Sequence, residues 1–319
     1  MIIDLPDTSI PTLTKKIVSL REDTGALALG RVMTLVVMAE EASIEPVLRE
    51  ANNGTRQHPS RIIVVVEGNR RGSNRLDAQI RVGGDAGASE MVVLRLYGEL
   101  TKHGEAVVMP LLLADSPIVA WWPRTAPRDI ADHPVGRLAQ RRITDAEAQT
   151  DPVKSMGVRA RYYEAGDTDL AWTRTTRWRG VLASLLDEPP YDEVLAAEVI
   201  GNKRSASADL LAGWLQVRLD VPVKRSSCGD DQEGVFGVTL ERTSGVTTLV
   251  RPDGVIGEID QPGKPARRIS LPRRNDSECL ADELSRLDAD ETYADALRVG
   301  IPALGAKPRR RNSNGGSEA

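Results

Sequence analysis

Two apolar segments joined by one helical segment constrain the fold of this chain most strongly. The first, Arg31 to Ala39, reads RVMTLVVMA, and the second, Arg61 to Glu67, reads RIIVVVE. Both are rich in β-branched residues, which is typical of strands that are covered on both faces. Between them, Ser43 to Ala51 is predicted to be a helix with Ser43 as its cap. This order predicts a β-α-β unit whose strands are parallel.

Further strands and helices extend this unit into a mixed sheet. Asn74 to Val82 alternates apolar and polar residues, and Glu90 to Leu100 alternates less strictly. The Gly-rich link Gly83 to Gly87 predicts that these two strands form a hairpin, and are therefore antiparallel. Thr12 to Glu22 has the apolar spacing of an amphipathic helix. We therefore predict an N-terminal domain, residues 1–165, with a mixed β-sheet, a β-α-β core and flanking helices.

The second half of the chain has a different pattern. Asp169 is predicted to cap one long helix, and Ser207 to cap another that ends at Leu219. From Val235 onwards, short strands alternate with turn sequences such as Pro252-Asp253-Gly254, which predicts an antiparallel meander. Two closing helices, Asp276 to Leu287 and Glu291 to Val299, are expected to cover one face of that sheet.

These patterns give two domains and a tail. We expect the C-terminal domain to span residues 166–303 and to combine helices with the antiparallel meander. Residues 304–319 are too polar to form a core, so we expect a disordered tail. The predicted fold class is α/β, as an α+β mixture of these two domains.

Charge and cysteine content exclude several classes of protein. The formal net charge is −4, so binding to nucleic acid or to an anionic membrane surface is not expected. No apolar run has the roughly 18 to 20 residues of a membrane helix, and the N-terminus lacks the order of a signal peptide. The two cysteines, Cys228 and Cys279, form no C-x-x-C pair, which favours the cytoplasm.

Catalytic motifs are also missing from the sequence. There is no Walker A pattern, no G-x-G-x-x-G fingerprint and no G-x-S-x-G elbow. The three histidines, His58, His103 and His133, lack the spacing of metal ligands. Two of them precede proline, which indicates a turn. We therefore predict no catalytic residue, no cofactor and no metal.

A tryptophan doublet makes an interaction surface the first functional hypothesis. Trp121 and Trp122 end an apolar segment that leads into a Pro-rich loop. Because neighbouring side chains of a strand point to opposite faces, at most one of the two indoles is expected to face outward. The alternative is a strand between two packed layers, with both indoles buried. The candidates for contact with a partner are Trp121, Trp122, Pro123, Arg124 and Arg128.

A second hypothesis concerns basic and hydroxyl side chains near the start of the long helix. Arg174, Thr176 and Arg177 could receive a phosphorylated ligand, which would make the chain a sugar-phosphate sensor or an unrecognised enzyme. The alternative is that these arginines face solvent or pair with acids.

Six segments, in the same order along both domains, are distinctive. They are HPSRIIVVV (His58 to Val66), LDAQIRVGGDAGASE (Leu76 to Glu90), LLLADSPIVAWWP (Leu111 to Pro123), GRLAQRRITD (Gly136 to Asp145), GDTDLAWTRTTRWRGVLAS (Gly166 to Ser184) and ECLADELSRLDADETYADAL (Glu278 to Leu297). These segments resemble the OpcA family of glucose-6-phosphate dehydrogenase assembly proteins, in the style of its actinobacterial members. The resemblance implies a non-catalytic cytoplasmic protein that binds the dehydrogenase, promotes its active oligomer and supports the oxidative pentose phosphate pathway.

One property of the family transfers poorly to this sequence. Cyanobacterial members are associated with redox control through cysteines, whereas this chain has only Cys228, in a turn, and Cys279, at the start of a predicted helix. An intramolecular switch would require their Cα atoms to approach within about 7 Å. We do not expect redox control here.

Overall fold

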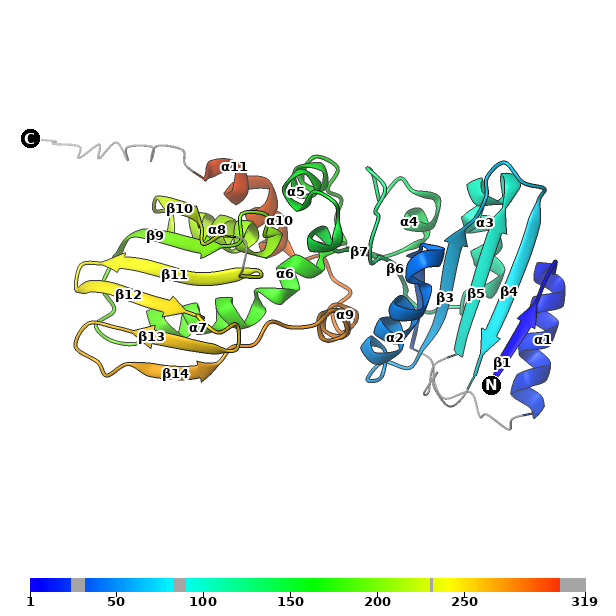
Figure 1. Ribbon diagram of the computed structural model, residues 1–319, viewed down its shortest axis with the longest axis horizontal. Coiled ribbons are helices and arrows are strands. Elements are labelled where there is room, and N and C mark those ends of the chain that lie inside the picture. Colours follow the sequence, from blue (N-terminus) through cyan, green and yellow to red (C-terminus); the bar gives the residue numbers. More distant parts are fainter. Residues whose placement is uncertain (24–31, 83–89, 230–231, 305–319) are drawn as a thin grey trace, which may run out of the picture. The chain divides into compact units, whose positions relative to one another are not determined.

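A computed structural model describes residues 1–23, 32–82, 90–229 and 232–304 of the chain (Figure 1). The chain divides into two compact units, each considered by itself below. The first unit holds Met1–Thr176 together with Arg273–Glu291, and the second holds Arg177–Pro272 and the chain from Thr292. The predicted link Gly83 to Gly87 and the predicted tail, apart from Leu304, lie outside the described residues.

The first unit is built on an eight-stranded mixed sheet in the order β1-β4-β5-β3-β2-β6-β7-β8. The parallel pairing of β2 with β3 and the antiparallel pairing of β4 with β5 confirm those two predictions. The strands are β1 (Ile2–Leu5), β2 (Met33–Ala39), β3 (Ser60–Glu67), β4 (Arg75–Arg81), β5 (Glu90–Tyr97), β6 (Ile118–Trp122), β7 (Arg141–Thr144) and β8 (Asp167–Asp169).

The strand order makes this sheet doubly wound. From β2 the chain moves outward through β3 to β5, and then returns to the other side of β2 to add β6, β7 and β8, all parallel. The direction of winding therefore reverses between β2 and β6. In open α/β sheets such a reversal leaves a crevice at the carboxyl ends of the strands, where ligands commonly bind.

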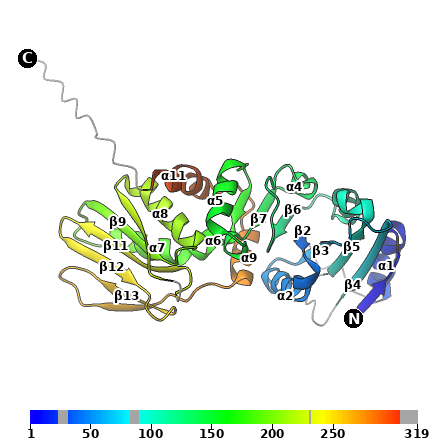
Figure 2. The same ribbon diagram turned by 45° about the horizontal axis from the view of Figure 1, so that its top comes forward.

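Helices cover both faces of the first sheet. One face packs against α2 and α9, and the opposite face packs against α1, α3 and α4. Figures 1 and 2 show α9, in orange, beside α2, in blue, although the two are far apart in the sequence. The helices of this unit are α1 (Ile10–Asp23), α2 (Ile44–Gly54), α3 (Gly104–Val108), α4 (Pro134–Leu138), α5 (Pro152–Arg161), α6 (Leu170–Arg174) and α9 (Asp276–Leu284).

The prediction that both closing helices cover the second sheet was wrong. In α9, Cys279, Leu280 and Leu284 are buried in the core of the first unit, against α2 and the first sheet. Helical periodicity shows that a face is buried, but it does not show which sheet buries it. The segment Arg273–Glu291 therefore belongs to the first unit, although it lies within the range 166–303 that was expected to form the second domain.

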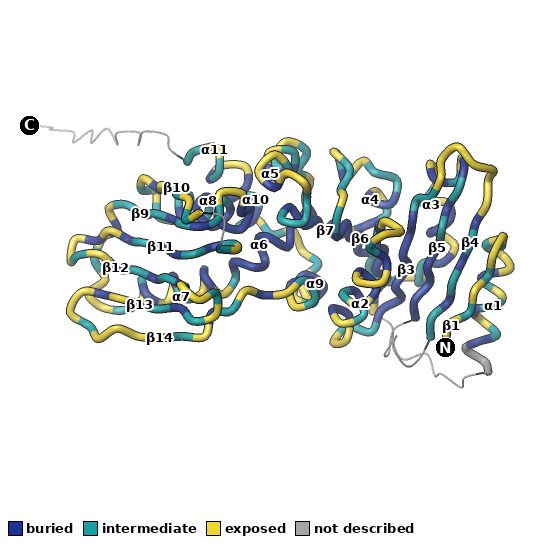
Figure 3. Tube along the Cα trace, viewed as in Figure 1, coloured by how far each residue is buried: buried dark blue, intermediate teal, exposed yellow. Residues whose placement is uncertain are grey.

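The second unit has a six-stranded sheet in the order β10-β9-β11-β12-β13-β14. The strands from β11 to β14 form the antiparallel meander that the turn sequences predict. Figure 3 shows that β3 of the first sheet is buried along almost its whole length, whereas β14 is largely exposed. The strands are β9 (Val194–Gly201), β10 (Val223–Ser227), β11 (Val235–Arg242), β12 (Gly245–Val250), β13 (Ile256–Asp260) and β14 (Arg267–Ser270).

The core of this unit lies between one sheet face and the helices α7 (Thr176–Leu186) and α8 (Ala206–Leu219). The single long helix expected after Asp169 is in fact two, because α6 ends at Arg174, although Asp169 does cap its first turn. The cap of α8 is Ser205 rather than Ser207. The last elements in the described part of the chain are α10 (Glu291–Asp295), a π-helix (Ala296–Gly300) that packs on α8, and α11 (Ile301–Ala303).

Candidate site at the carboxyl ends of the parallel strands

The turn after β2 lies where a doubly wound fold holds the phosphates of a dinucleotide, but its residues are acidic. It runs from Glu40 through a short 3-10 helix, Glu41–Ser43, into α2, and it contains no glycine. Glu41 accepts a hydrogen bond from Arg95 Nε at 2.9 Å. A phosphate-binding turn needs glycines for close backbone approach and free N–H groups. Carboxylates at this position oppose the binding of an anion.

A buried charge network occupies the carboxyl ends of β6, β7 and β8. At its centre, the Arg174 guanidinium donates two hydrogen bonds to the Asp145 carboxylate, at 2.8 and 2.6 Å, and one to Asp276 Oδ1 at 2.5 Å. The side chains of Arg174 and Asp145 are only 4% and 2% exposed. Burial disfavours the charged guanidinium, but the charge of Asp145 more than compensates and raises the pKa of Arg174. Arg174 is therefore a buried cation held by carboxylates.

Asp169, at the end of β8, is a second buried acid in this network. It accepts hydrogen bonds from Thr144 Oγ1 at 2.6 Å, from Ala146 N at 3.0 Å and from Ala171 N at 2.9 Å. Burial, reinforced by the negative charge of Asp145, raises the pKa of Asp169 to about 6. The hydrogen bonds act in the opposite direction but do not cancel that effect.

Arg124 lies at the edge of the network and is more accessible than Arg174. Its side chain is 34% exposed and lies 3.4 Å from Glu50 Oε1 and 3.8 Å from Asp276 Oδ2. Burial and the nearby charge of Asp276 raise the pKa of Glu50, and Arg124 partly offsets this. The network thus joins α2, the loop after β6, α6 and the first turn of α9.

Further polar contacts join the first sheet and α6 to the segment Arg273–Glu291, which contains α9. Arg141 in β7 forms a buried ion pair with Glu283 of α9, and Glu283 also accepts from Thr173. Trp172 Nε1 donates to Asp290 Oδ2 at 2.7 Å. These charges hold the chain's own segment Arg273–Glu291 against the first sheet. Among the described residues, no cluster of His, Cys, Asp and Glu side chains could hold a metal ion.

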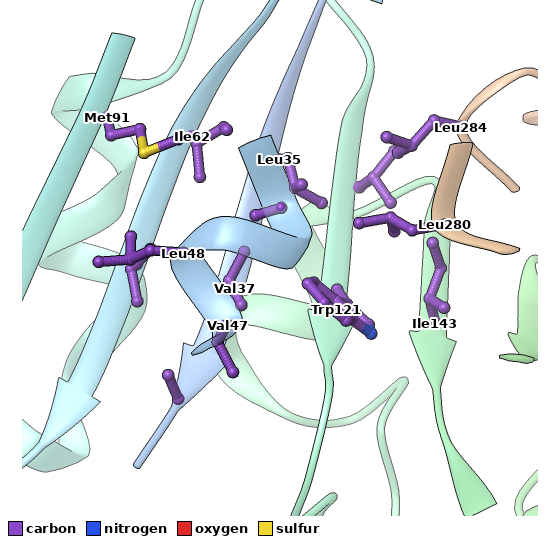
Figure 4. Close-up of a cluster of buried hydrophobic side chains, with 14 of the residues drawn as sticks. Leu35, Val37, Val47, Leu48, Ile62, Met91, Trp121, Ile143, Leu280 and Leu284 are labelled. Carbon is purple, nitrogen blue, oxygen red and sulfur yellow. The ribbon is translucent and has the colours of Figure 1, made fainter. Parts of the chain in front are cut away.

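Both tryptophans of the doublet are buried, on opposite faces of β6. Trp121 is 0% exposed and packs in the core between β6, α2 and α9, next to Val47, Ile143 and Leu280 (Figure 4). Trp122 is 2% exposed and belongs to the core on the other face, where it meets the ring of His133 edge-on. Neither indole faces outward, so the structure supports the alternative of a strand between two packed layers, and burial leaves neither Trp121 nor Trp122 accessible to a partner.

Only some of the predicted contact residues in the loop after Trp122 are accessible. Pro123 is buried, Arg124 is half-buried and Arg128 is exposed. The buried Arg159 guanidinium donates to the carbonyl oxygens of Pro127 and Arg128, at 2.5 and 2.9 Å. These hydrogen bonds connect the loop to α5, and the Arg128 guanidinium lies 4.9 Å from the centre of the Tyr162 ring. Contact of this loop with a partner stays a prediction.

The structure separates the residues of the phosphate hypothesis. Arg174 is buried and its terminal nitrogens are occupied by carboxylates, which a phosphate would have to displace. Thr176 is half-buried at the start of α7, and Arg177 is exposed. These positions do not form a common anion site around Arg174.

The cysteines lie in very different surroundings. Cys279 is fully buried in the core of the first unit, and burial raises the pKa of its thiol to about 12. Cys228 is half-buried in the second unit. Because the thiolate is the reactive form, Cys279 is a poor redox group as it stands.

The acids that make up the network have no recognisable sequence motif. Asp145 and Asp276 resemble ordinary loop and helix-cap residues, and Arg141 belongs to a short polar strand that the periodicity does not detect. The clustering of Arg-Arg-Ile-Thr-Asp at residues 141–145 was the available signal. Charges next to a buried isoleucine in a short strand indicate ion pairs within the core.

The fold and site define a two-unit α/β protein whose doubly wound sheet has acids and paired arginines at its carboxyl edge. Two family models match it. The model of the glucose-6-phosphate dehydrogenase subunit N-terminal domain covers residues 51–161, and that of the C-terminal domain covers residues 165–297. The chain therefore belongs to the OpcA family. A search of curated proteins found no match.

Solved structures resemble the chain only weakly. A 3-ketoreductase from Actinomadura kijaniata, KijD10, is 10% identical, with a TM-score of 0.43; the alignment covers 85% of this chain and 96% of KijD10. Biliverdin reductase from Synechocystis sp. PCC 6803 is 12% identical, with a TM-score of 0.42; the alignment covers 86% of this chain and 99% of the reductase. TM-scores of this size support no inference about function. No described helix combines the length and apolar character needed to cross a membrane.

Proposed function

We propose that this chain is a non-catalytic accessory protein that binds glucose-6-phosphate dehydrogenase in the cytoplasm, promotes its assembly into the active oligomer and activates it. Through this enzyme it would support the oxidative pentose phosphate pathway and the supply of NADPH, as an actinobacterial member of its family. The observation that carries the proposal is the match of both dehydrogenase-subunit family models, in order, over most of the chain.

The site geometry supports a role without catalysis. The carboxyl edge of the first sheet, where a doubly wound enzyme would hold its cofactor, has Glu40 and Glu41 in the first turn and a buried ion-pair network further along. Arg174 is engaged by Asp145 and Asp276, so its charge stabilises the fold. These residues are arranged to hold the chain together rather than to act on a substrate.

The test is to mix the purified chain with the dehydrogenase from the same organism and to measure the mass by light scattering alongside turnover. We expect a species heavier than either protein and a higher turnover than that of the dehydrogenase alone. Arg128→Ala should weaken the complex if the loop after β6 contributes to it. Arg49→Ala, which removes an exposed arginine from α2 and leaves the loop unchanged, is the matched control.

Two results would contradict the proposal. Unchanged masses together with unchanged turnover would show that the two proteins do not act on each other. A calorimetric titration of the chain alone with glucose 6-phosphate or NADP should give no heat of binding. Saturable heat would instead favour the sugar-phosphate sensor.

A further inference from the structure

A groove in the second unit lies between α7 and the last two strands of the sheet. Its volume is about 580 Å³, and its floor is apolar, formed by Val181 and Leu185 of α7 together with Ile259 and Ile269 of the sheet. All of its lining residues belong to the second unit. The groove opens beside β14, the final strand in the order of the sheet.

The glycine at the groove is not required by packing among the described residues. Gly180 lies in the interior of α7, and a Cβ atom built there would meet no described atom within 4 Å. Glycine inside a helix costs roughly 1 kcal/mol relative to alanine. Here that cost is not offset by a close contact within the described chain. A glycine that lines a groove leaves room for another molecule to approach the helix backbone closely.

The edge of β14 offers backbone hydrogen-bonding groups to such a molecule. Leu271 N donates to Val255 O at 2.8 Å, and Ile256 is the register partner of Ser270. Because hydrogen-bonded and non-hydrogen-bonded pairs alternate in an antiparallel ladder, the N–H and C=O groups of Ser270 and Arg268 point away from β13. An extended segment could add to this edge and send every second side chain towards the groove.

The charges around the groove favour an acidic segment. Arg267 and Lys264 share the carboxylate of Glu188, and Arg268 pairs with Glu258. Arg177 lies on the same face of α7, one turn before Gly180 and Val181. It is exposed, and the structure records no ion pair for it within the described residues. Among the residues that line the groove, Arg267 and Arg268 are cationic and Glu188 is the one carboxylate.

We propose that β14 and the groove beneath α7 bind an extended, acidic segment of the dehydrogenase by strand addition, with an apolar side chain of that segment in the groove. This inference rests on the proposed function, because it takes the occupant to be part of that partner. Backbone hydrogen bonds to Arg268 and Ser270 supply affinity, while the groove and Arg177 select an apolar residue flanked by acids.

The test measures the dissociation constant of the complex with the dehydrogenase for matched pairs of variants. Gly180→Leu fills the groove, and Ala183→Leu makes a similar change at an exposed position of the same helix outside it. Ser270→Pro removes the outward N–H group, and Ser270→Ala retains it. We expect a loss of affinity of about tenfold for Gly180→Leu and Ser270→Pro, and less than about twofold for their controls.

A charge-reversal variant, Arg177→Glu, tests the proposed surface even if Gly180→Leu or Ser270→Pro does not fold. Arg177→Glu should weaken the complex about tenfold at low salt and less at high salt, because the interaction of exposed charges is screened. Lys203→Glu makes the same change in charge elsewhere on the second unit and should have little effect. Circular dichroism checks that each variant is folded.

The possible results separate the two proposals. If the unaltered chain binds the dehydrogenase and Gly180→Leu, Ser270→Pro and Arg177→Glu bind equally well, the proposed surface is wrong and the proposed function stands. If the unaltered chain does not bind, both are wrong. If the chain alone forms dimers that Ser270→Pro abolishes, the edge pairs with a second copy and the assignment to the dehydrogenase is wrong.

Discussion

The two units differ in how deeply their ion pairs are buried. In the first unit, Arg174–Asp145 and Arg141–Glu283 are ion pairs whose side chains are at most 7% exposed. In the second unit, the Lys224–Glu198 pair is exposed to 74% and 31%, and the Arg242–Asp192 pair, although Arg242 is buried, leaves the Asp192 side chain 14% exposed. Buried charges are costly unless they are paired, so the first unit depends on each pair being complete. The second unit does not depend on its surface pairs in this way.

The largest expected effect is in the buried network. Arg174→Met should lower the free energy of unfolding by about 3 to 5 kcal/mol, because Asp145 would remain buried without its cation. Urea denaturation followed by tryptophan fluorescence measures the change. The double variant Arg174→Met with Asp145→Asn should recover part of the loss, since the uncompensated charge is then removed. A loss below about 1 kcal/mol for the single variant would mean that the two units do not differ as described.

Apolar packing should matter equally in both units. Leu280→Ala, in α9, should cost about 3 kcal/mol through lost burial and the cavity left behind. Leu182→Ala, in the core of the second unit, should cost a similar amount. Thermal and urea denaturation of both variants check this. A negligible effect at Leu280 would contradict the docking of α9 on the first unit.

The next effect depends on pH. Burial raises the pKa of Asp169 from 3.8 to about 6, so the folded state holds a proton that the unfolded state has already released between these values. The unfolded state then binds fewer protons, and the contribution of Asp169 to stability falls as pH rises from about 4 to 6. Asp169→Asn should remove this dependence. One pKa unit corresponds to about 1.4 kcal/mol, so the relative gain of the variant is at most about 3 kcal/mol.

The measurement for Asp169 is a series of urea titrations from pH 4 to pH 7.5. The stability of Asp169→Asn relative to the unaltered chain should rise up to pH 6 and stay constant above it. A relative stability that does not change with pH would show that Asp169 is not protonated in the folded chain.

The smallest effect is expected on the surface of the second sheet. Lys224→Met removes the partner of Glu198 from a position that is 74% exposed. Exposed ion pairs contribute about 0 to 1 kcal/mol, so the midpoint of urea unfolding should hardly move. A loss comparable to that of Arg174→Met would remove the contrast between the units.

Apolar patterns and turn sequences predicted most of the sheet elements. The runs RVMTLVVMA and RIIVVVE become β2 and β3, and the turns after Val235 become the meander. Alternation also correctly placed Trp121 and Trp122 on opposite faces. These features depend on local sequence, because strand periodicity and turn chemistry act between near neighbours.

What could not be predicted depends on residues far apart in the chain. The strands β7 and β8 consist largely of polar residues, which lie in the core only because their charges find partners such as Glu283 and Arg142. Arg174 looked available for a phosphate because Asp145 and Asp276 are distant in sequence. The acceptors of a buried arginine cannot be identified from its neighbours along the chain.

The return of α9 to the first unit also sets an order for synthesis. The first sheet is complete in sequence once Asp169 has been made, but Leu280 and Glu283, which complete its core and its ion pair with Arg141, follow only after the whole span Arg177–Pro272. A nascent chain would expose part of the apolar face that includes Trp121 until then. The first unit is therefore expected to begin folding first on the ribosome, but it can be completed only after the span Arg177–Pro272 of the second unit has been synthesised.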